Sequence, residues 1–311
     1  MTIRSPAEWG VDQFRSAGIA LDSFSRVWRS EADVQPPIVT VRRITAADLS
    51  DVLRNGWADF GANRTDIIFL CVLYPVIGIV LAYAAPGRDL LPLIFPLASG
   101  FALVAPFAAL GLYEMSRRRE LGVAVGWTDV FRVLSAPSLG AIVWLGLLLT
   151  AIFLIWLLVA YAIYRVTLGP LPPASAISFM HDVLTMAAGW TMIVAGVGLG
   201  FMFAALVFCL SVVGFPLLLD REAGLETAVA VSVRTVLANP GPMALWALIV
   251  AGSLVIGSLP LFVGLAIALP LLGHSTWHLY RKAVVWQEPP VASTPSPGSA
   301  FSAPTRSERQ G

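Results

Sequence analysis

His274 and His278 are the residues whose type and spacing come closest to a chemical site. Positions i and i+4 of a helix lie on one face, so both imidazoles could share a metal ion, or one could bind a haem iron. Two ligands do not complete a metal site, and no Cys, Asp or Glu lies near them in the sequence. We favour a structural alternative, in which the two imidazoles bond to backbone groups or lipid headgroups at the end of a helix.

The sequence carries no other motif that is typical of catalysis. It has no P-loop, no Cys-x-x-Cys pair and no Ser/His/Asp arrangement in polar surroundings. No ionisable residue lies in the central part of an apolar run, and Glu114 and Asp220, at the ends of such runs, stand beside arginines that can pair with them. We therefore expect neither an enzyme nor an ion-coupled transporter.

Composition indicates an integral membrane protein. The chain has 311 residues, of which 57% are hydrophobic and only 13% charged. Soluble domains have roughly 25% charged residues, and no soluble fold can bury this much apolar surface. The net charge of +1 gives no reason to expect a nucleic-acid partner. The expected surroundings are a lipid bilayer.

The apolar runs predict an all-α polytopic transmembrane bundle with six spans. A helix needs roughly 20 apolar residues to cross a bilayer. The charge-free runs of this length are residues 67–88, 90–113, 133–164, 183–219 and 244–280. Gly257-Ser258-Leu259-Pro260 should break the last run into two spans, about 243–257 and 260–280. Residues 183–219 are long for one span, and Pro216 should end or kink that helix.

The basic residues support the even number of spans. Lys and Arg concentrate in cytoplasmic loops of membrane proteins. With six spans, every Lys and Arg except Arg88 and Arg165 falls on one side. Five spans would move Arg281 and Lys282 to the wrong side. We therefore expect a multi-pass protein of the bacterial inner membrane with both termini in the cytoplasm.

Three segments that precede odd-numbered spans share one pattern. Counted back from Asn63, Pro137 and Asn239, the positions 14, 10, 6 and 3 residues earlier are all apolar. These positions are Leu49, Leu53, Trp57 and Phe60; Val123, Trp127, Phe131 and Leu134; and Leu225, Val229, Val233 and Val236. The spacing is helical, and a one-sided helix beside a membrane should lie in the interface plane. We predict three pseudo-repeats, each an interfacial amphipathic helix followed by a helical hairpin.

Several further residues have expected places in this architecture. The three hairpins close with similar segments, residues 114–117, 220–222 and 278–281. Gly196 and Gly200 form a small-xxx-small pair that should serve helix packing. The expected interfacial aromatic residues are Trp57, Trp127, Trp277 and Tyr280. We divide the chain into an N-terminal arm with a partly amphipathic helix (1–38), a six-span membrane domain (39–286) and a disordered Pro/Ser-rich tail (287–311).

Three stretches give the chain a family resemblance: VTVRRI at residues 39–44, DREAGL at 220–225 and PLLGHSTWHLYR at 270–281. Together they resemble a bacterial family of predicted integral membrane proteins, domain of unknown function 2189, over roughly residues 36–286. Members of that family are sometimes labelled cytochrome c oxidase subunit I. A haem–copper oxidase core needs about six histidine ligands and about a dozen spans, whereas this chain has three histidines. The resemblance therefore implies a membrane protein without implying an activity.

Three functional hypotheses follow. The first is a non-enzymatic membrane component that binds lipid or another membrane protein, with no cofactor. The second is a transporter or permease for a neutral or lipid-like substrate. The third is an accessory protein of a respiratory complex that uses His274 and His278 to bind haem or a metal. The sequence does not determine an oligomeric state.

Overall fold

A computed structural model describes residues 38–62, 92–93, 96–97, 109–123, 125–126, 132–136, 138–169, 171–259 and 263–287 of the chain. Several predictions fall outside these residues. They are the N-terminal arm, the span at 67–88, most of the span at 90–113, Trp127 and the Pro/Ser-rich tail.

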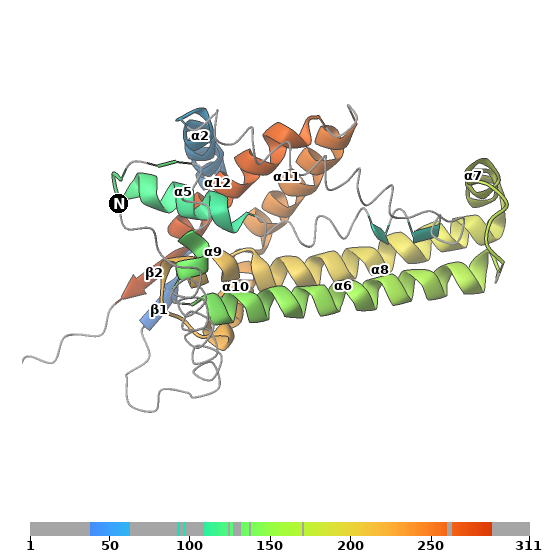
Figure 1. Ribbon diagram of the computed structural model, residues 1–311, viewed down its shortest axis with the longest axis horizontal. Helices are drawn as coiled ribbons and strands as arrows, with labels where there is room; N and C mark the ends of the chain where they lie inside the picture. The colour runs from blue at the N-terminus through green and yellow to red at the C-terminus, as the bar shows by residue number, and fades with distance from the viewer. Residues whose placement is uncertain are drawn as a thin grey trace, which may run out of the picture.

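A long helical hairpin is the most extended feature of the molecule (Figure 1). Its arms are α6 (Leu139–Thr167) and α8 (Ala187–Ser211), which lie side by side and are joined through the short helix α7 (Ala176–Thr185). Trp156 of α6 fills the space above Gly200 of α8 and packs against Phe203, with 5.6 Å between the ring centroids. At 1.5 Å per residue, the 29 residues of α6 exceed the roughly 30 Å of a bilayer core.

The apolar run at 183–219 is not one continuous helix. The first interruption lies at Met186, whose backbone is extended and separates α7 from α8. The second lies at residues 212–213, before α9 (Gly214–Asp220). Pro216 explains the second break, because proline has no N–H to donate to the carbonyl of Val212 and its ring crowds that carbonyl. The interruption thus lies one turn before the proline that we expected to end or kink the helix.

A second hairpin consists of α11 (Pro240–Ser258) and α12 (Leu265–Ala283), preceded by α10 (Leu225–Ala238). The break falls where Gly257 and Ser258 predicted it. Gly257 and Gly264 approach so closely that a Cβ on Gly264 would lie 2.7 Å from the Gly257 Cα, which explains why glycine occupies both positions.

Three of the described segments are long and apolar enough to cross a membrane: Leu139–Thr167, Ala187–Asp220 and Pro240–Ser258. Helix α12, the described part of the expected sixth span, is not among them. Its C-terminal half carries polar and basic side chains, including His274, His278 and Lys282. The described structure is therefore mostly helical with three candidate spans, and the count of six remains a prediction.

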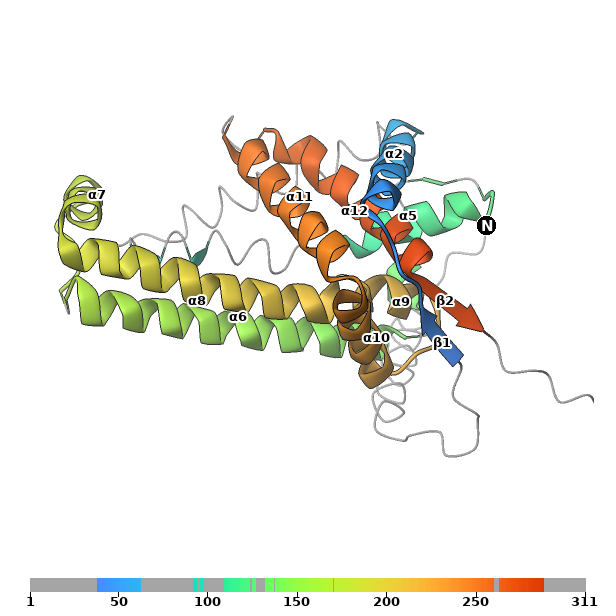
Figure 2. The ribbon, with the colours of Figure 1, turned by 180° about the vertical axis from the view of Figure 1, so that it is seen from behind.

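Helix α12, near the end of the described chain, lies beside helices from earlier in the chain (Figure 2). It packs on α2 (Ala46–Ala62) and on α5 (Leu110–Glu120). A Cβ on Gly56 of α2 would lie 2.8 Å from the backbone nitrogen of Ser275, so this crossing requires glycine. The N-terminus of α2 has a capping box, in which the Thr45 N–H donates to the Asp48 carboxylate at 2.8 Å.

Two short strands, which we did not predict, accompany the helices of the mostly helical described structure. Strand β1 (Ile38–Val41) pairs antiparallel with β2 (Val284–Gln287), in a register that places Val41 opposite Val284. Five of the eight paired residues are valine or threonine, whose β-branched side chains favour extended backbone. We missed the strands because they lie at the two ends of the segment 39–286, which we had assigned to a membrane domain built of helices alone.

The helices α2 and α10 correspond to the first and third interfacial segments of the predicted repeat, and the middle segment lies only partly within the described residues. Their most buried faces are offset from the apolar positions that we used. In α2 the buried residues are Leu49, Val52, Gly56 and Asp59; in α10 they are Ala228, Val231, Ser232 and Thr235. Both helices pack into the protein on one side, and the threefold repeat remains a prediction.

Candidate functional site

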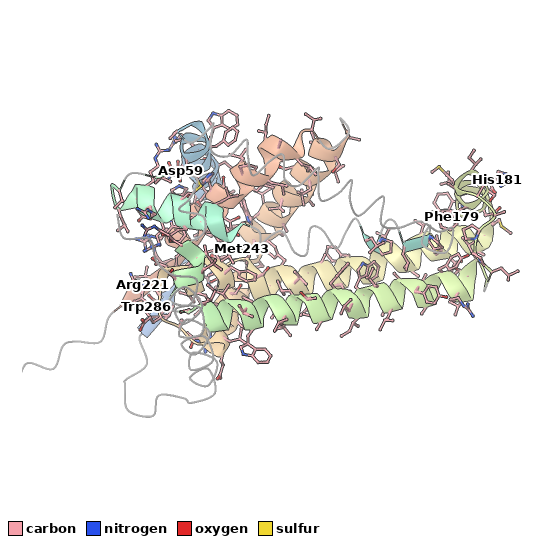
Figure 3. The ribbon with its side chains drawn as sticks, viewed as in Figure 1. Asp59, Phe179, His181, Arg221, Met243 and Trp286 are labelled. Carbon is pink, nitrogen blue, oxygen red and sulfur yellow. The ribbon has the colours of Figure 1, made fainter. Side chains whose placement is uncertain are left out.

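Five side chains from three helices form a buried polar cluster: Asp59 of α2, Ser116 and Arg119 of α5, and His274 and His278 of α12. The Asp59 carboxylate lies at its centre. Its Oδ2 accepts from the Ser116 hydroxyl at 2.7 Å and lies 2.8 Å from His278 Nε2, while its Oδ1 lies 3.3 Å from Arg119 Nη1. Figure 3 shows Asp59 between α2 and α5. The cluster joins the first described helix to the last.

Hydrogen counting assigns the tautomer of His274. The Ser116 hydroxyl has one hydrogen, which it donates to Asp59, so its oxygen accepts from His274 Nδ1–H at 2.8 Å. The other ring nitrogen of a neutral His274 then carries a lone pair. That Nε2 is buried and, among the described residues, makes no hydrogen bond. The chain Asp59–Ser116–His274 is thus a continuous hydrogen-bonded path.

The environment keeps Asp59 ionised. Only 8% of its side chain is exposed, and this burial by itself would raise the pKa of the carboxyl. Hydrogen bonds from His278 and Ser116, together with the electrostatic attraction of His278, outweigh burial and hold the pKa of the Asp59 carboxyl below its ordinary value of 3.8. His278 is 20% exposed and Arg119 is 39% exposed, so the cluster reaches solvent along these two side chains.

A charged junction lies beside this cluster and joins α5, α9 and α12. We define it as Glu120, Asp220, Trp277, Tyr280 and Arg281. Glu120 accepts from Trp277 Nε1 at 3.1 Å and from Arg281 Nη2 at 2.8 Å. Asp220 accepts from the Tyr280 hydroxyl at 2.8 Å and from Arg281 Nη1 at 3.5 Å. One arginine at the end of α12 therefore connects acids from two other helices.

The three segments that close the predicted hairpins lie on the helices that the junction joins. Residues 114–117 lie within α5, 220–222 begin at the last residue of α9 and 278–281 lie in α12, and the contacts above link all three helices. Arg117 pairs with Glu114 at 2.7 Å, which raises the pKa of the guanidinium despite its partial burial. Arg221 pairs with Asp220 at 3.3 Å and lies 5.7 Å from the centre of the Trp286 ring. The sequence similarity of these segments corresponds to a shared location.

Lys282 fastens the end of α12 to the start of α2 at the protein surface. Its Nζ donates to Asp48 and to Asp51, each at 2.9 Å. Hydrogen bonds from Lys282 lower the pKa of both carboxyls, and the carboxylates in turn raise the pKa of the lysine. Because these groups are solvent-exposed, water and salt screen the pairs and their contribution to stability is small.

The two histidines have different partners from those that we expected. They bond to Ser116 and Asp59, not to backbone groups or headgroups. Among the described residues, no group of three His, Cys, Asp or Glu side chains is placed to hold a metal ion. Sequence reasoning missed Asp59 because it lies 219 positions from His278. The burial of such a polar residue becomes visible only when α2 and α12 are packed together.

The structure changes the interpretation of two expected interfacial aromatics. Trp277 and Tyr280 are 0% and 2% exposed and belong to the charged junction, so they pack inside the protein instead of anchoring it in headgroups. Their polar atoms bond to Glu120 and Asp220, which satisfies them without water or lipid. Trp57 differs: it is 53% exposed and lies against Phe60, with 5.5 Å between the ring centroids.

The expected packing glycines of α8 have unequal environments. A Cβ on Gly200 would lie 3.1 Å from the Trp156 ring, so this glycine permits the close approach of α6. A Cβ on Gly196 would have no neighbouring atom within 4 Å. The contact at Gly200 lies within this chain.

The lowered pKa of Asp59 predicts how stability depends on pH. The native carboxyl binds its proton less tightly than the unfolded one, so its contribution is present above the unfolded pKa and is lost as the pH falls through the native pKa. Thermal unfolding in detergent should therefore show a wild-type advantage over Asp59→Asn that is constant from about pH 5 to 7 and shrinks below about pH 4. A constant difference down to pH 3 would contradict this assignment.

The described helices and the polar cluster can be set beside known proteins. No curated protein and no solved structure matches the chain. One family model does match, and its residues run from the expected second span through α5, α6, α7, α8 and α9. Residues 94–220 match the family described as "Predicted integral membrane protein (DUF2189)", which confirms the resemblance to that family over this part of the chain.

Proposed function

We propose that this protein is a non-enzymatic, multi-pass component of the bacterial inner membrane that binds another membrane protein or lipid along its α6–α8 hairpin. The observation that carries the proposal is that very little of the α8 surface is buried inside the protein. Only 6% of the most apolar window in Ala187–Asp220 is buried inside the protein, against 28% for α6. A helix that is apolar on all sides and covered on so little of its surface requires other apolar surroundings.

Large side chains lie along the uncovered surface of both helices. On α8, Phe201 is 72% exposed and Val194 is 69% exposed; on α6, Leu158 is 69% exposed. Each such side chain would cost about 1.5–3 kcal/mol to keep in water instead of an apolar environment. Acyl chains or the apolar face of another membrane protein remove this cost.

The charge distribution supports an orientation with both termini in the cytoplasm. Arg117, Arg118 and Arg119 of α5 lie at one end of the molecule with Arg221 and the C-terminus of α12, whereas Arg165 lies at the end of α6 that is next to α7. Figure 3 places Arg221 and Trp286 opposite His181 and Phe179. The basic end is expected to face the cytoplasm. Both strands lie at this end, which favours cytoplasmic termini.

The polar cluster supports a structural role over catalysis. Asp59 is bonded within the protein on both oxygens, and His278 pairs with it. Such a cluster holds α2, α5 and α12 in register, and it fixes the cytoplasmic ends of the bundle from which the α6–α8 hairpin extends. The hydrogen-bond partners of the cluster lie within the chain, so we assign the binding of another membrane protein or of lipid to the hairpin.

Photo-crosslinking in native membranes tests the proposal. We expect p-benzoylphenylalanine at Val197 or Phe201 of α8 to form a crosslink to one protein of defined mass, or to lipid, because these side chains are exposed in the apolar segment. The same group at Glu222, which is exposed in the polar loop after α9, is the matched control and should give neither.

The proposal fails if the α8 positions crosslink only within the chain and the affinity-purified protein retains neither a stoichiometric partner nor lipid. A crosslink to protein identifies the partner by mass spectrometry. A crosslink confined to lipid assigns the hairpin to lipid binding.

A further inference from the structure

Helix α7 has an unusual place in the molecule: it lies across the ends of α6 and α8 instead of continuing along either of them. Figures 1 and 2 both show α7 end-on at the tip of the long hairpin, while α6 and α8 are seen from the side. A capping box starts the helix, in which the Ser178 N–H donates to the Ser175 hydroxyl at 3.1 Å and the Ser175 N–H donates to the Ser178 hydroxyl at 3.0 Å. The turn of direction is thus encoded locally.

A few contacts hold α7 to the hairpin on its inner side. The Phe179 ring meets the Tyr164 ring edge-on at 6.1 Å, and the Tyr164 hydroxyl donates to the Leu171 carbonyl at 2.6 Å. The Trp190 indole donates to the Leu184 carbonyl at 3.0 Å. At Gly189, a Cβ would overlap the backbone at the end of α7, so glycine permits the sharp turn into α8. The position of α7 is therefore fixed, although none of its residues is buried.

The rest of the α7 surface divides into two faces. Ile177, Met180 and Leu184 are 84%, 63% and 53% exposed, and their spacing of three and four residues places them along one side. The opposite side carries polar side chains. These are Ser178, His181, Asp182 and Thr185. A ten-residue helix with an uncovered apolar face and a polar face has the pattern of a helix that lies at a membrane surface.

The apolar face of α7 continues onto the apolar hairpin. Met186, Trp190 and Val194 are 49%, 55% and 69% exposed and lead from α7 down α8. Near the same end of α6, Arg165 Nη1 lies 3.5 Å from the Tyr161 hydroxyl. Tyr, Trp and Arg at the end of an apolar helix are typical of the headgroup region. The apolar surface of α7 is therefore joined to the surface of helices that are long enough to span the bilayer.

We propose that α7 lies in the interface plane of the non-cytoplasmic leaflet, with Ile177, Met180 and Leu184 among the upper acyl chains and its polar face toward headgroups and water. The partner of this surface is lipid. The inference rests on α6 and α8 crossing the membrane, and it does not depend on the partner or lipid bound along the middle of α8.

Spin-label depth measurements on the full-length protein test this. Cys71 and Cys209 are replaced by Ala, and single cysteines are introduced at the apolar positions Ile177→Cys and Leu184→Cys and at the matched polar positions Asp182→Cys and Thr185→Cys. The protein is reconstituted into vesicles of phosphatidylethanolamine and phosphatidylglycerol. The ratio of collision rates with oxygen and with a water-soluble nickel chelate should be ~2-fold or more higher at the apolar positions than at the polar ones.

Val197→Cys in the middle of α8 calibrates the apolar extreme of the scale. Equal ratios at all four α7 positions, with easy access for nickel, would place α7 in water and overturn the proposal. Low access for both reagents at the apolar positions would show that protein covers them, which also overturns it. Because the labelled side chains lie at the surface, labelling should leave the protein monodisperse. The crosslinking of Val197 to a partner protein or lipid is a separate measurement, so a failure of the proposed function can be told apart from a failure of this inference.

Discussion

An Asp59→Ala variant should lose about 3 kcal/mol of unfolding free energy, the lower end of the cost of breaking a buried ion pair. The change removes the acceptor for Ser116 and His278 and the anionic partner of Arg119, all from one buried position. Without the Asp59 carboxylate, Ser116 of α5 and His278 of α12 lose the acceptor of their hydrogen bonds. The measurement is the midpoint and slope of denaturant unfolding of the purified protein in detergent.

Two variants make that result specific to the cluster. Asp59→Asn keeps the shape and can still accept a hydrogen bond, so it should lose less stability than Asp59→Ala. Asp182→Ala removes an acid that is 48% exposed and 3.5 Å from His181 in α7, and it should change stability by no more than about 0.5 kcal/mol. Equal losses for Asp59→Ala and Asp182→Ala would show that the buried cluster contributes nothing beyond a surface charge.

A Gly56→Val variant should separate α2 from α12 and destabilise the protein by about 3 kcal/mol, the upper range for overpacking. The nearest atoms to a Cβ at this position include the Ser275 backbone at 2.8 and 2.9 Å, which cannot rotate away as a side chain could. The helices must therefore move apart, and this also strains the contact of Asp59 with His278. Unfolding in detergent, together with protease sensitivity of residues 46–62, measures the effect.

Gly61→Val is the matched control, since it lies in the same helix and a Cβ there meets no atom within 4 Å. Both variants change glycine to valine in a helix, so their intrinsic helix propensities change alike. The difference between them reports the α2–α12 crossing alone. If both variants behave alike, the close approach at Gly56 is not what holds α2 in place.

Helix boundaries that depend on local chemistry could be predicted from the sequence. Gly257 and Ser258 end α11 where expected, and Thr45 and Asp48 form a capping box at the start of α2. These signals act within a few residues and need no tertiary partner. The break at Met186 lacks such a signal: it lies in an uninterrupted apolar run, so residues 183–219 read as one span and α7 was missed.

The candidate site could be predicted only in part. The spacing of His274 and His278 correctly places them on one helix, but their partners come from α2 and α5. In α2 we expected an apolar face through Leu53 and Trp57, whereas the buried face passes through Gly56 and Asp59. Packing against the backbone of Ser275 rotates the helix toward its glycine, because glycine allows the closest approach. Hydrophobic spacing alone cannot anticipate that choice.

Trp277 and Tyr280 illustrate the same limit for aromatic residues. An amphipathic ring near the end of an apolar run has two ways to satisfy its polar atom, in headgroups or on a buried acid. Here Glu120 and Asp220, each more than 50 residues away, supply the second option. Only the fold brings those acids within reach.

The pairing of β1 with β2 has a consequence for biosynthesis. Val41 pairs with Val284, roughly 240 residues later in the chain, and α2 likewise packs on α12. At a translation rate of roughly 5–20 residues per second, the start of the chain therefore waits at least ten seconds or so for its partners. During that interval β1 is an open strand edge, and the carboxylate of Asp59 has neither histidine to bond. Helix α12 and strand β2, synthesised roughly 240 residues later, thus complete the fold of α2 and β1.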